Sequence, residues 1–71
     1  MKKQIKITIE CENAAFYDGD KWAGEQEIVR IIETACKKIE MHGILNDQPL
    51  FDNNGNRVGS VRANFIDQIP F

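Results

Sequence analysis

The sequence predicts one α+β domain over residues 1–71, in which a single helix packs on a small antiparallel sheet in β-α-β-β order. Three observations predict this fold. Apolar residues alternate with polar ones over residues 3–11, recur at helical spacing over residues 25–41, and return in short runs around a turn over residues 44–65. A chain of 71 residues is near the size at which one core is only just sufficient.

The first predicted strand covers residues 3–11. One of its faces is apolar and consists of Ile5, Ile7, Ile9 and Cys11. Strict alternation of apolar and polar residues is typical of a strand with one buried face. We therefore expect this apolar face to pack against the helix.

The stretch between Glu12 and Gly24 is the least regular part of the chain. Its Asp18-Gly19-Asp20 segment has turn chemistry, and Asp20 could cap a helix that begins near Lys21. Around this turn lie the acidic residues Glu10, Glu12, Asp18, Asp20, Glu25 and Glu27. An acidic loop that also carries aromatic residues is typical of a protein-binding surface.

The residues predicted to contact a partner in this loop are Phe16, Tyr17, Asp18, Asp20 and Trp22. A second interpretation stays open, in which Phe16 closes one end of the core and Trp22 packs at the start of the helix. The two interpretations differ in whether these aromatic rings are exposed.

The helix predicted over residues 25–41 is amphipathic. Its apolar arc covers roughly 160° and consists of Ile28, Val29, Ile31, Ile32, Ala35, Cys36 and Ile39. The opposite face should be solvated, and it carries the ion pairs Glu27–Arg30 and Glu33–Lys37. Gly43 is expected at the left-handed position that ends the helix.

A hairpin is predicted around the turn at residues 52–55. A type I turn with Gly55 in the left-handed bulge position would pair Asp52 with Asn56. A type I′ turn at Asn54-Gly55 is the competing register. The two registers place different residues of the first strand opposite those of the second.

The first register puts Leu50 beside Val58, whereas the second pairs Phe51 with Val58. A bulge at Gly59 would shift the phase of the strand that follows. The residues that would then face inward are Val61, Ala63 and Phe65.

Composition and charge exclude several classes of protein. The net charge is only −2, and no apolar run is long enough to cross a bilayer. The N-terminal residues lack the apolar segment of a signal peptide, so a cytoplasmic location without membrane contact is expected. Nucleic acid is not an expected partner, because no recognition helix is evident. The basic residues form only two small patches, Lys2, Lys3 and Lys6 in one and Arg57 and Arg62 in the other.

The sequence shows no constellation that points to catalysis. It contains no nucleophile next to a base, no metal-ligand cluster and no glycine-rich phosphate loop. We therefore expect a protein that is not an enzyme and holds no metal or cofactor. Cys11 and Cys36 are expected as reduced core residues, with pairing across the core left open.

Two segments carry a resemblance. Residues 9–16 match the pattern I-x-C-x-N-A-A-F, and residues 50–59 match L-x-D-x-N-G-N-x-V-G. With the helix between them, they resemble a group of small phage and prophage proteins over residues 5–62. The resemblance implies an accessory protein of phage origin that acts inside a bacterial host cell, and it implies no activity.

Three functions follow as hypotheses. The first is a phage-derived binding protein that inhibits or modulates a host protein, for instance a bacterial defence component. The second is a dimeric, sponge-like binder of a nucleotide or other small ligand, with anion contacts from Lys6, Arg57 and Arg62. The third is a structural accessory protein.

A homodimer is expected, because the uncovered side of a small sheet invites self-association. The apolar C-terminal tail, residues 66–71, is expected to pack on its own domain or on a second copy.

Overall fold

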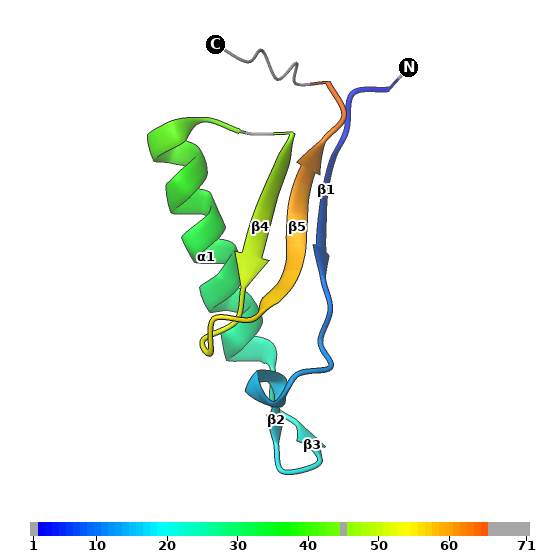
Figure 1. Ribbon diagram of the computed structural model, residues 1–71, viewed down its shortest axis with the longest axis vertical. Coiled ribbons are helices and arrows are strands. Elements are labelled where there is room, and N and C mark those ends of the chain that lie inside the picture. Colours follow the sequence, from blue (N-terminus) through cyan, green and yellow to red (C-terminus); the bar gives the residue numbers. More distant parts are fainter. Residues whose placement is uncertain (1, 45, 66–71) are drawn as a thin grey trace.

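The structure, a computed structural model, describes residues 2–44 and 46–65. One helix lies along a three-stranded antiparallel sheet, which confirms the α+β class and the β-α-β-β order (Figure 1). The sheet has the strand order β1-β5-β4, with bounds β1 Ile5–Ile9, β4 Asp47–Phe51 and β5 Arg57–Ala63. The packing expected of the tail at residues 66–71 lies outside the described residues.

The stretch between β1 and the helix holds structure that the sequence did not predict. A short 3-10 helix, Ala14–Phe16, leads into a two-stranded hairpin. Its strands are β2, Tyr17–Asp18, and β3, Lys21–Trp22. Figure 1 shows this hairpin at one end of the molecule, beyond the main sheet.

Helix α1 covers Glu25–His42. Gly43 follows with a φ of 78°, and its N–H donates to the Ile39 carbonyl at 2.8 Å, so the predicted end of the helix at a glycine with positive φ is confirmed, although its ψ of 175° lies outside the left-handed helical region. The alternative start near Lys21, capped by Asp20, is wrong. Asp20 lies instead in the turn between β2 and β3, and α1 begins after Gly24.

The hairpin between β4 and β5 has the first of the two predicted turns. The Asp52 N–H donates to the Asn56 carbonyl at 2.9 Å, and the Gly55 N–H donates to the Asp52 carbonyl at 3.1 Å. Gly55 has a φ of 83°, which glycine adopts without strain. The competing type I′ register is therefore wrong.

The predicted bulge is present but lies one residue earlier. Phe51 pairs with Arg57 and Leu50 pairs with Gly59, so Val58 is the extra residue. Leu50 and Val58 nevertheless share the core. The phase shift turns Val61 and Ala63 inward as expected, whereas Phe65 is exposed.

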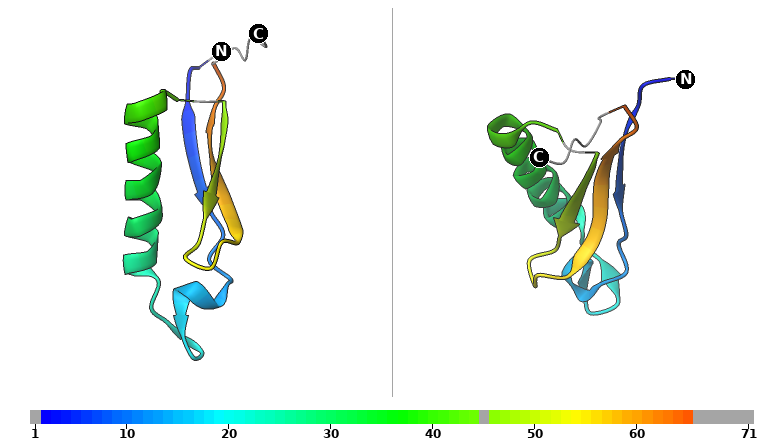
Figure 2. Two further views of the ribbon diagram at one scale, coloured as in Figure 1. Left: turned by 60° about the vertical axis from the view of Figure 1, so that its left-hand side comes forward. Right: turned by 45° about the horizontal axis from the view of Figure 1, so that its top comes forward.

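The core lies between α1 and the β4 side of the sheet. Its buried residues are Phe16, Ile31, Ala35, Leu50, Val58 and Val61. The helix runs beside β4, and β1 lies on the far side of the sheet (Figure 1), while Figure 2 shows helix and sheet as two separate layers. The expectation that the helix covers the apolar face of β1 is wrong for Ile5 and Ile7, which are 49% and 52% exposed.

The helix is also rotated relative to the predicted facing. Glu27, expected in solvent, is buried, while Val29 and Cys36 from the apolar arc are exposed. Cys11 is partly buried, and both cysteines are free thiols. This rotation places Glu27 against the β4–β5 turn, where it accepts a hydrogen bond from the Asn53 N–H, and it places Arg30 within hydrogen-bond distance of the Phe51 carbonyl.

Candidate functional site

The β2–β3 hairpin places two exposed aromatic rings side by side. Tyr17 pairs directly with Trp22 across the two strands. Between them, Gly19 has a φ of 65° while Asp20 has a negative φ, as a type II′ two-residue turn requires. The Ala23 N–H donates to the Phe16 carbonyl at 2.9 Å and closes the base of the hairpin. The sequence signal for this turn was its Asp-Gly-Asp composition.

The exposed rings are anchored to the core through Phe16. The Trp22 ring stacks parallel to the buried Phe16 ring, with centroids 6.2 Å apart and an interplanar angle of 3°. Tyr17 meets Trp22 edge-on, at 5.7 Å and 80°. Trp22 Nε1 donates to Glu25 Oε1 at 2.7 Å, and its ring lies against Gly24. These contacts hold Trp22 in one orientation.

Each of the two interpretations of this loop describes part of it. Phe16 is fully buried, so it is a core residue and not a residue that a partner can touch. Tyr17 and Trp22 remain 37% and 45% exposed. Asp18 and Asp20 are also exposed, at the tip of the same hairpin. Trp22 therefore combines the two roles, since it packs at the start of α1 and also presents apolar surface to solvent.

A second candidate surface lies on the face of the sheet that points away from α1. Strand pairing sets Lys6 opposite Arg62, and Arg62 opposite Asp47. Asp47 Oδ1 lies 3.6 Å from Arg57 Nη2 and 3.7 Å from Arg62 Nε. A shallow hollow of about 520 Å³ opens on this face. Its lining includes the predicted anion contacts Lys6, Arg57 and Arg62, together with Thr8, Glu10, Val58, Gly59 and Ser60.

Two buried carboxylates, which the sequence analysis missed as a pair, lie at the β4–β5 turn, where Glu27 joins the turn to α1 and Asp52 joins it to Asn13. Glu27 accepts two hydrogen bonds from Arg30, at 2.9 and 2.8 Å, and one from the Asn53 N–H at 2.7 Å. The paired guanidinium is the main reason that the pKa of Glu27 is lowered, and the Asn53 hydrogen bond adds to it against the opposing effect of burial. Arg30 also donates to the Phe51 carbonyl at 3.2 Å.

Asp52 organises the turn from inside. Asn13 Nδ2 donates to Asp52 Oδ2 at 3.0 Å, and the N–H groups of Asn54 and Asn56 donate to Asp52 Oδ1 at 2.9 Å each. These hydrogen bonds, that from Asn13 first, lower the pKa of Asp52. The signal in the sequence was an aspartate followed by asparagines at positions where it can accept their backbone N–H groups.

The motifs that carry the resemblance therefore meet in space. Asn13 and Phe16 come from the first motif, and Asp52 comes from the second. All three residues serve the core or the polar network beside it. Asn13, Phe16 and Asp52 therefore serve the fold, whereas Tyr17 and Trp22 are exposed.

No helix in the described part of the chain is long and apolar enough to span a bilayer. Within residues 2–44 and 46–65, no three His, Cys, Asp or Glu side chains form a group that could hold a metal ion. No protein-family model, curated protein or solved structure matches the chain.

Proposed function

We propose that this protein is a non-enzymatic binding module that docks on another protein through the β2–β3 hairpin. The observation that carries the proposal is the exposed Tyr17–Trp22 pair, held in place by the stack of Trp22 on the buried Phe16. Tyrosine and tryptophan are enriched among the residues that dominate binding energy at interfaces. Because Trp22 is already ordered, little conformational entropy is lost when it docks.

The charge around the rings indicates the kind of partner. Asp18 and Asp20 lie at the hairpin tip, and Glu25 holds the Trp22 indole from α1. Carboxylates around an apolar centre favour a basic partner surface, mainly by speeding encounter and by disfavouring acidic competitors. We therefore propose a protein partner with a positively charged rim around an apolar pocket.

The biological context of the proposal comes from the resemblance to small phage and prophage proteins. In that context the partner is a protein of the bacterial host cell, and the hairpin inhibits or modulates it. A component of a bacterial defence system is one such target. Neither the fold nor the surface chemistry depends on this part of the proposal.

Replacing Tyr17 and Trp22 together with alanine is expected to abolish capture of the partner from host lysate. The matched control is a Glu33→Ala, Lys37→Ala double variant, which removes an exposed pair of side chains from α1. Captured proteins are identified by mass spectrometry and then tested as purified partners, with the single tryptophan as a fluorescent reporter of binding. Loss of binding in the control instead would move the site to the helix.

Circular dichroism decides whether the double variant is folded. If it is not folded, Tyr17→Ala replaces it, because Tyr17 contacts the edge of Trp22 and leaves the stack on Phe16 intact. A folded Tyr17→Ala protein that binds its purified partner as tightly as wild type would refute docking through the hairpin.

We also propose a homodimer, formed through the apolar surface between β1 and α1. Ile5 and Ile7 are exposed on the sheet face toward the helix layer, where they pair with Ala63 and Val61. Arg30, Thr34 and Lys38 line the side of α1 next to β4. Val29 and Cys36, which are exposed, and Ile32, which is partly buried, lie on the other flank of α1, and we propose that this flank faces the side of β1.

A second copy fits this surface because each protomer has one row of uncovered apolar residues on β1 and another on α1. A two-fold axis lays the helix row of each copy over the strand row of the other, so one surface serves both copies. On β1 the charged and polar residues, Lys6 and Thr8, point to the opposite face of the sheet. No charge on β1 would therefore be buried.

Ile7→Lys is expected to convert the dimer to a monomer at micromolar concentration, as measured by analytical ultracentrifugation. Ile7 is half exposed, so the variant should remain folded. Thr8→Lys adds the same charge one residue away on the opposite face, and it should leave the dimer intact. A wild-type protein that stays monomeric up to high micromolar concentration would rule out the dimer.

A further inference from the structure

The outer face of the sheet combines cations with an exposed aromatic ring. Alternation along the paired strands places its side chains in three rows: Lys6, Arg62 and Asp47; Thr8, Ser60 and Pro49; Arg57 and Phe51. The first and third rows carry the charge, and the middle row is uncharged. The hollow that opens on this face lies over β1 and β5.

The positive charges of this face are only partly neutralised. Asp47 shares one oxygen between Arg57 and Arg62, at 3.6 and 3.7 Å. Charge-assisted hydrogen bonds are normally about 2.7–2.9 Å long, so neither guanidinium is tied to this carboxylate in a bidentate pair. Lys6, opposite Arg62, adds a third cation, and Glu10 is the acidic residue in the lining. N–H donors of the two guanidinium groups and of Lys6 therefore remain available to an anionic ligand.

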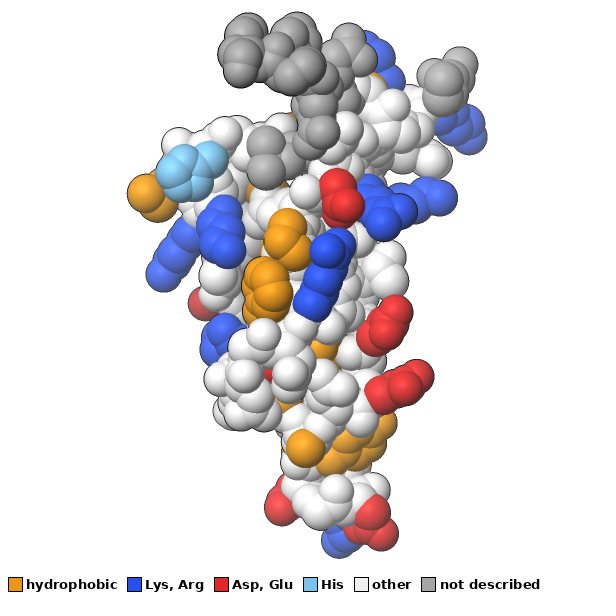
Figure 3. All heavy atoms as spheres, viewed as in Figure 1, with side chains coloured by type: hydrophobic (Ala, Val, Ile, Leu, Met, Phe, Trp, Pro, Cys, Tyr) orange, Lys and Arg blue, Asp and Glu red, His pale blue; other side chains and the backbone are white. Residues whose placement is uncertain are grey.

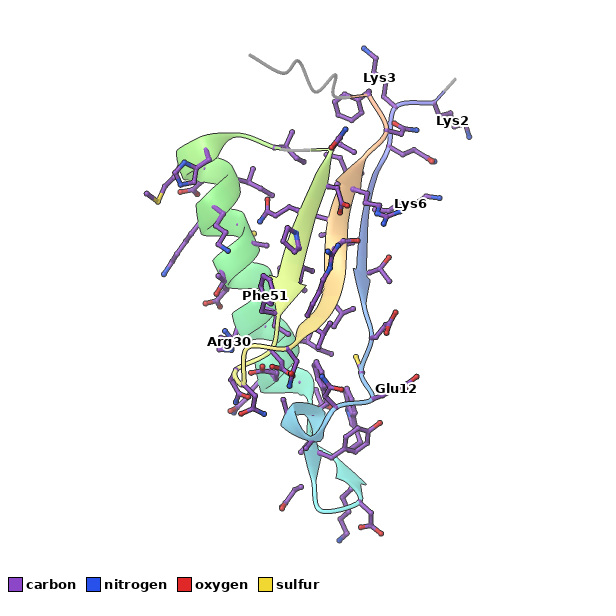
Figure 4. All side chains as sticks on the ribbon, viewed as in Figure 1. Lys2, Lys3, Lys6, Glu12, Arg30 and Phe51 are labelled. Atoms are coloured by element: carbon purple, nitrogen blue, oxygen red, sulfur yellow. The ribbon has the colours of Figure 1, made fainter. Side chains whose placement is uncertain are left out.

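The strand pairing explains why the sequence treats these cations as two weak patches. Lys6 is in the first strand of the chain and Arg62 is in the last, yet they are cross-strand neighbours. Figure 4 shows Lys2, Lys3 and Lys6 together along the start of the chain and β1. Most of the acidic side chains in this view lie toward the hairpin end of the molecule (Figure 3). A net charge of −2 is therefore compatible with a basic face.

Phe51 is the exposed aromatic residue next to the hollow, at the edge where β4 and α1 form a groove. It is 43% exposed, and it pairs with Arg57 across β4 and β5. Arg30 donates to its carbonyl at 3.2 Å, which ties this end of β4 to α1 (Figure 4). An exposed aromatic ring beside a guanidinium is a platform on which a nucleobase can stack.

We infer that the outer face of the sheet binds a nucleotide, with its phosphate in the hollow between Lys6, Arg57 and Arg62 and its base against Phe51. The shared chemistry is a phosphate next to a flat base. A free nucleotide or a single strand of nucleic acid can supply it. This site is separate from the β2–β3 hairpin, so an experiment can refute the nucleotide site without refuting docking through the hairpin, and the reverse. The sequence led to the expectation that nucleic acid is not a partner. The inference differs because the pairing of β1 with β5 brings the two basic patches together.

Three probes at low salt distinguish the possible sources: a fluorescein-labelled oligothymidylate, thymidine monophosphate and inorganic polyphosphate. Fluorescence anisotropy measures the oligonucleotide, and calorimetry measures the other two. Binding of the oligonucleotide but not of the mononucleotide assigns a single strand, and binding of both assigns the nucleotide unit. Binding of neither overturns the inference, as does polyphosphate binding without any nucleotide binding.

Variants test the two halves of the site. Lys6→Glu should weaken nucleotide binding by about tenfold or more, whereas Lys37→Glu, the same change on the solvent face of α1, should have little effect. Phe51→Ala should weaken binding of the base-containing probes roughly fivefold or more and leave polyphosphate unchanged. Equal effects of Lys6→Glu and Lys37→Glu would mean non-specific attraction, and they would overturn the site.

Discussion

Replacing Phe16 with alanine is expected to unfold most of the protein at 37 °C. Phe16 is fully buried, and it joins the β2–β3 hairpin to the core beneath α1. Truncating a buried phenylalanine costs roughly 3–5 kcal/mol. Domains are stable by only about 0.05–0.15 kcal/mol per residue, so a chain of 71 residues has little stability to spare. Thermal unfolding followed by circular dichroism measures the loss.

The matched control is Phe51→Ala, the same truncation at an exposed position of β4. It should lower the free energy of unfolding by less than about 1 kcal/mol. Trp22 fluorescence adds a local probe, since loss of the Phe16 ring leaves the indole without its stacking partner. A Phe16→Ala protein that melts with the wild type would show that the hairpin is not anchored in the core.

Elements specified by neighbouring residues could be predicted from the sequence. The helix, its end at Gly43 and the turn closed by Asp52 and Asn56 depend on local periodicity, a glycine with positive φ and a short hydrogen-bonded loop. The β2–β3 hairpin follows the same rules, but its strands are only two residues long each and show no periodicity. Its turn was therefore visible in the sequence and its strands were not.

Features set by tertiary contacts could not be predicted. The apolar arc of α1 is wide enough to face the sheet at several rotations, and the contacts of Glu27 with Asn53 and of Arg30 with the Phe51 carbonyl favour one of them. That choice buries Glu27 and leaves Cys36 exposed. A charged residue three positions before an arginine gives no signal that it is buried, because the same pair is common on solvated helix faces.

The candidate sites divide in the same way. Residue type alone drew attention to Tyr17 and Trp22, but whether Phe16 was core or surface depended on packing that no local pattern reports. The sequence suggested Lys6, Arg57 and Arg62 as anion contacts, but not how they meet. The pairing of β1 with β5 places Lys6 beside Arg62.

Acid is expected to destabilise the protein through Glu27 and Asp52. Both carboxylates have a lowered pKa in the folded state, Glu27 mainly through Arg30 and Asp52 mainly through Asn13. In the window between the folded and unfolded pKa values, the unfolded chain binds more protons than the folded one, so stability falls as the pH falls. The loss should begin near the ordinary pKa of a glutamate, about 4.3, and continue until both folded carboxylates are protonated.

Glu27→Gln should lower the free energy of unfolding at pH 7 by roughly 1–3 kcal/mol, because Arg30 loses its charged partner and the Asn53 N–H a charged acceptor. Asp52→Asn should also be destabilising, since an amide replaces an acceptor of several hydrogen bonds. Because each variant removes a titrating group, each should also reduce the dependence of the melting temperature on pH below about 4.3.

The control is Glu33→Gln, which neutralises an exposed glutamate of the same helix and should leave the melting curve close to that of the wild type at every pH. A Glu27→Gln, Asp52→Asn protein that keeps the full acid-induced loss would show that other groups govern the transition. The two residues lie on different elements but meet at one turn, so their effects should be less than additive. Such coupling would identify the junction of α1 with the β4–β5 turn as one cooperative unit, distinct from the hairpin and from the basic face.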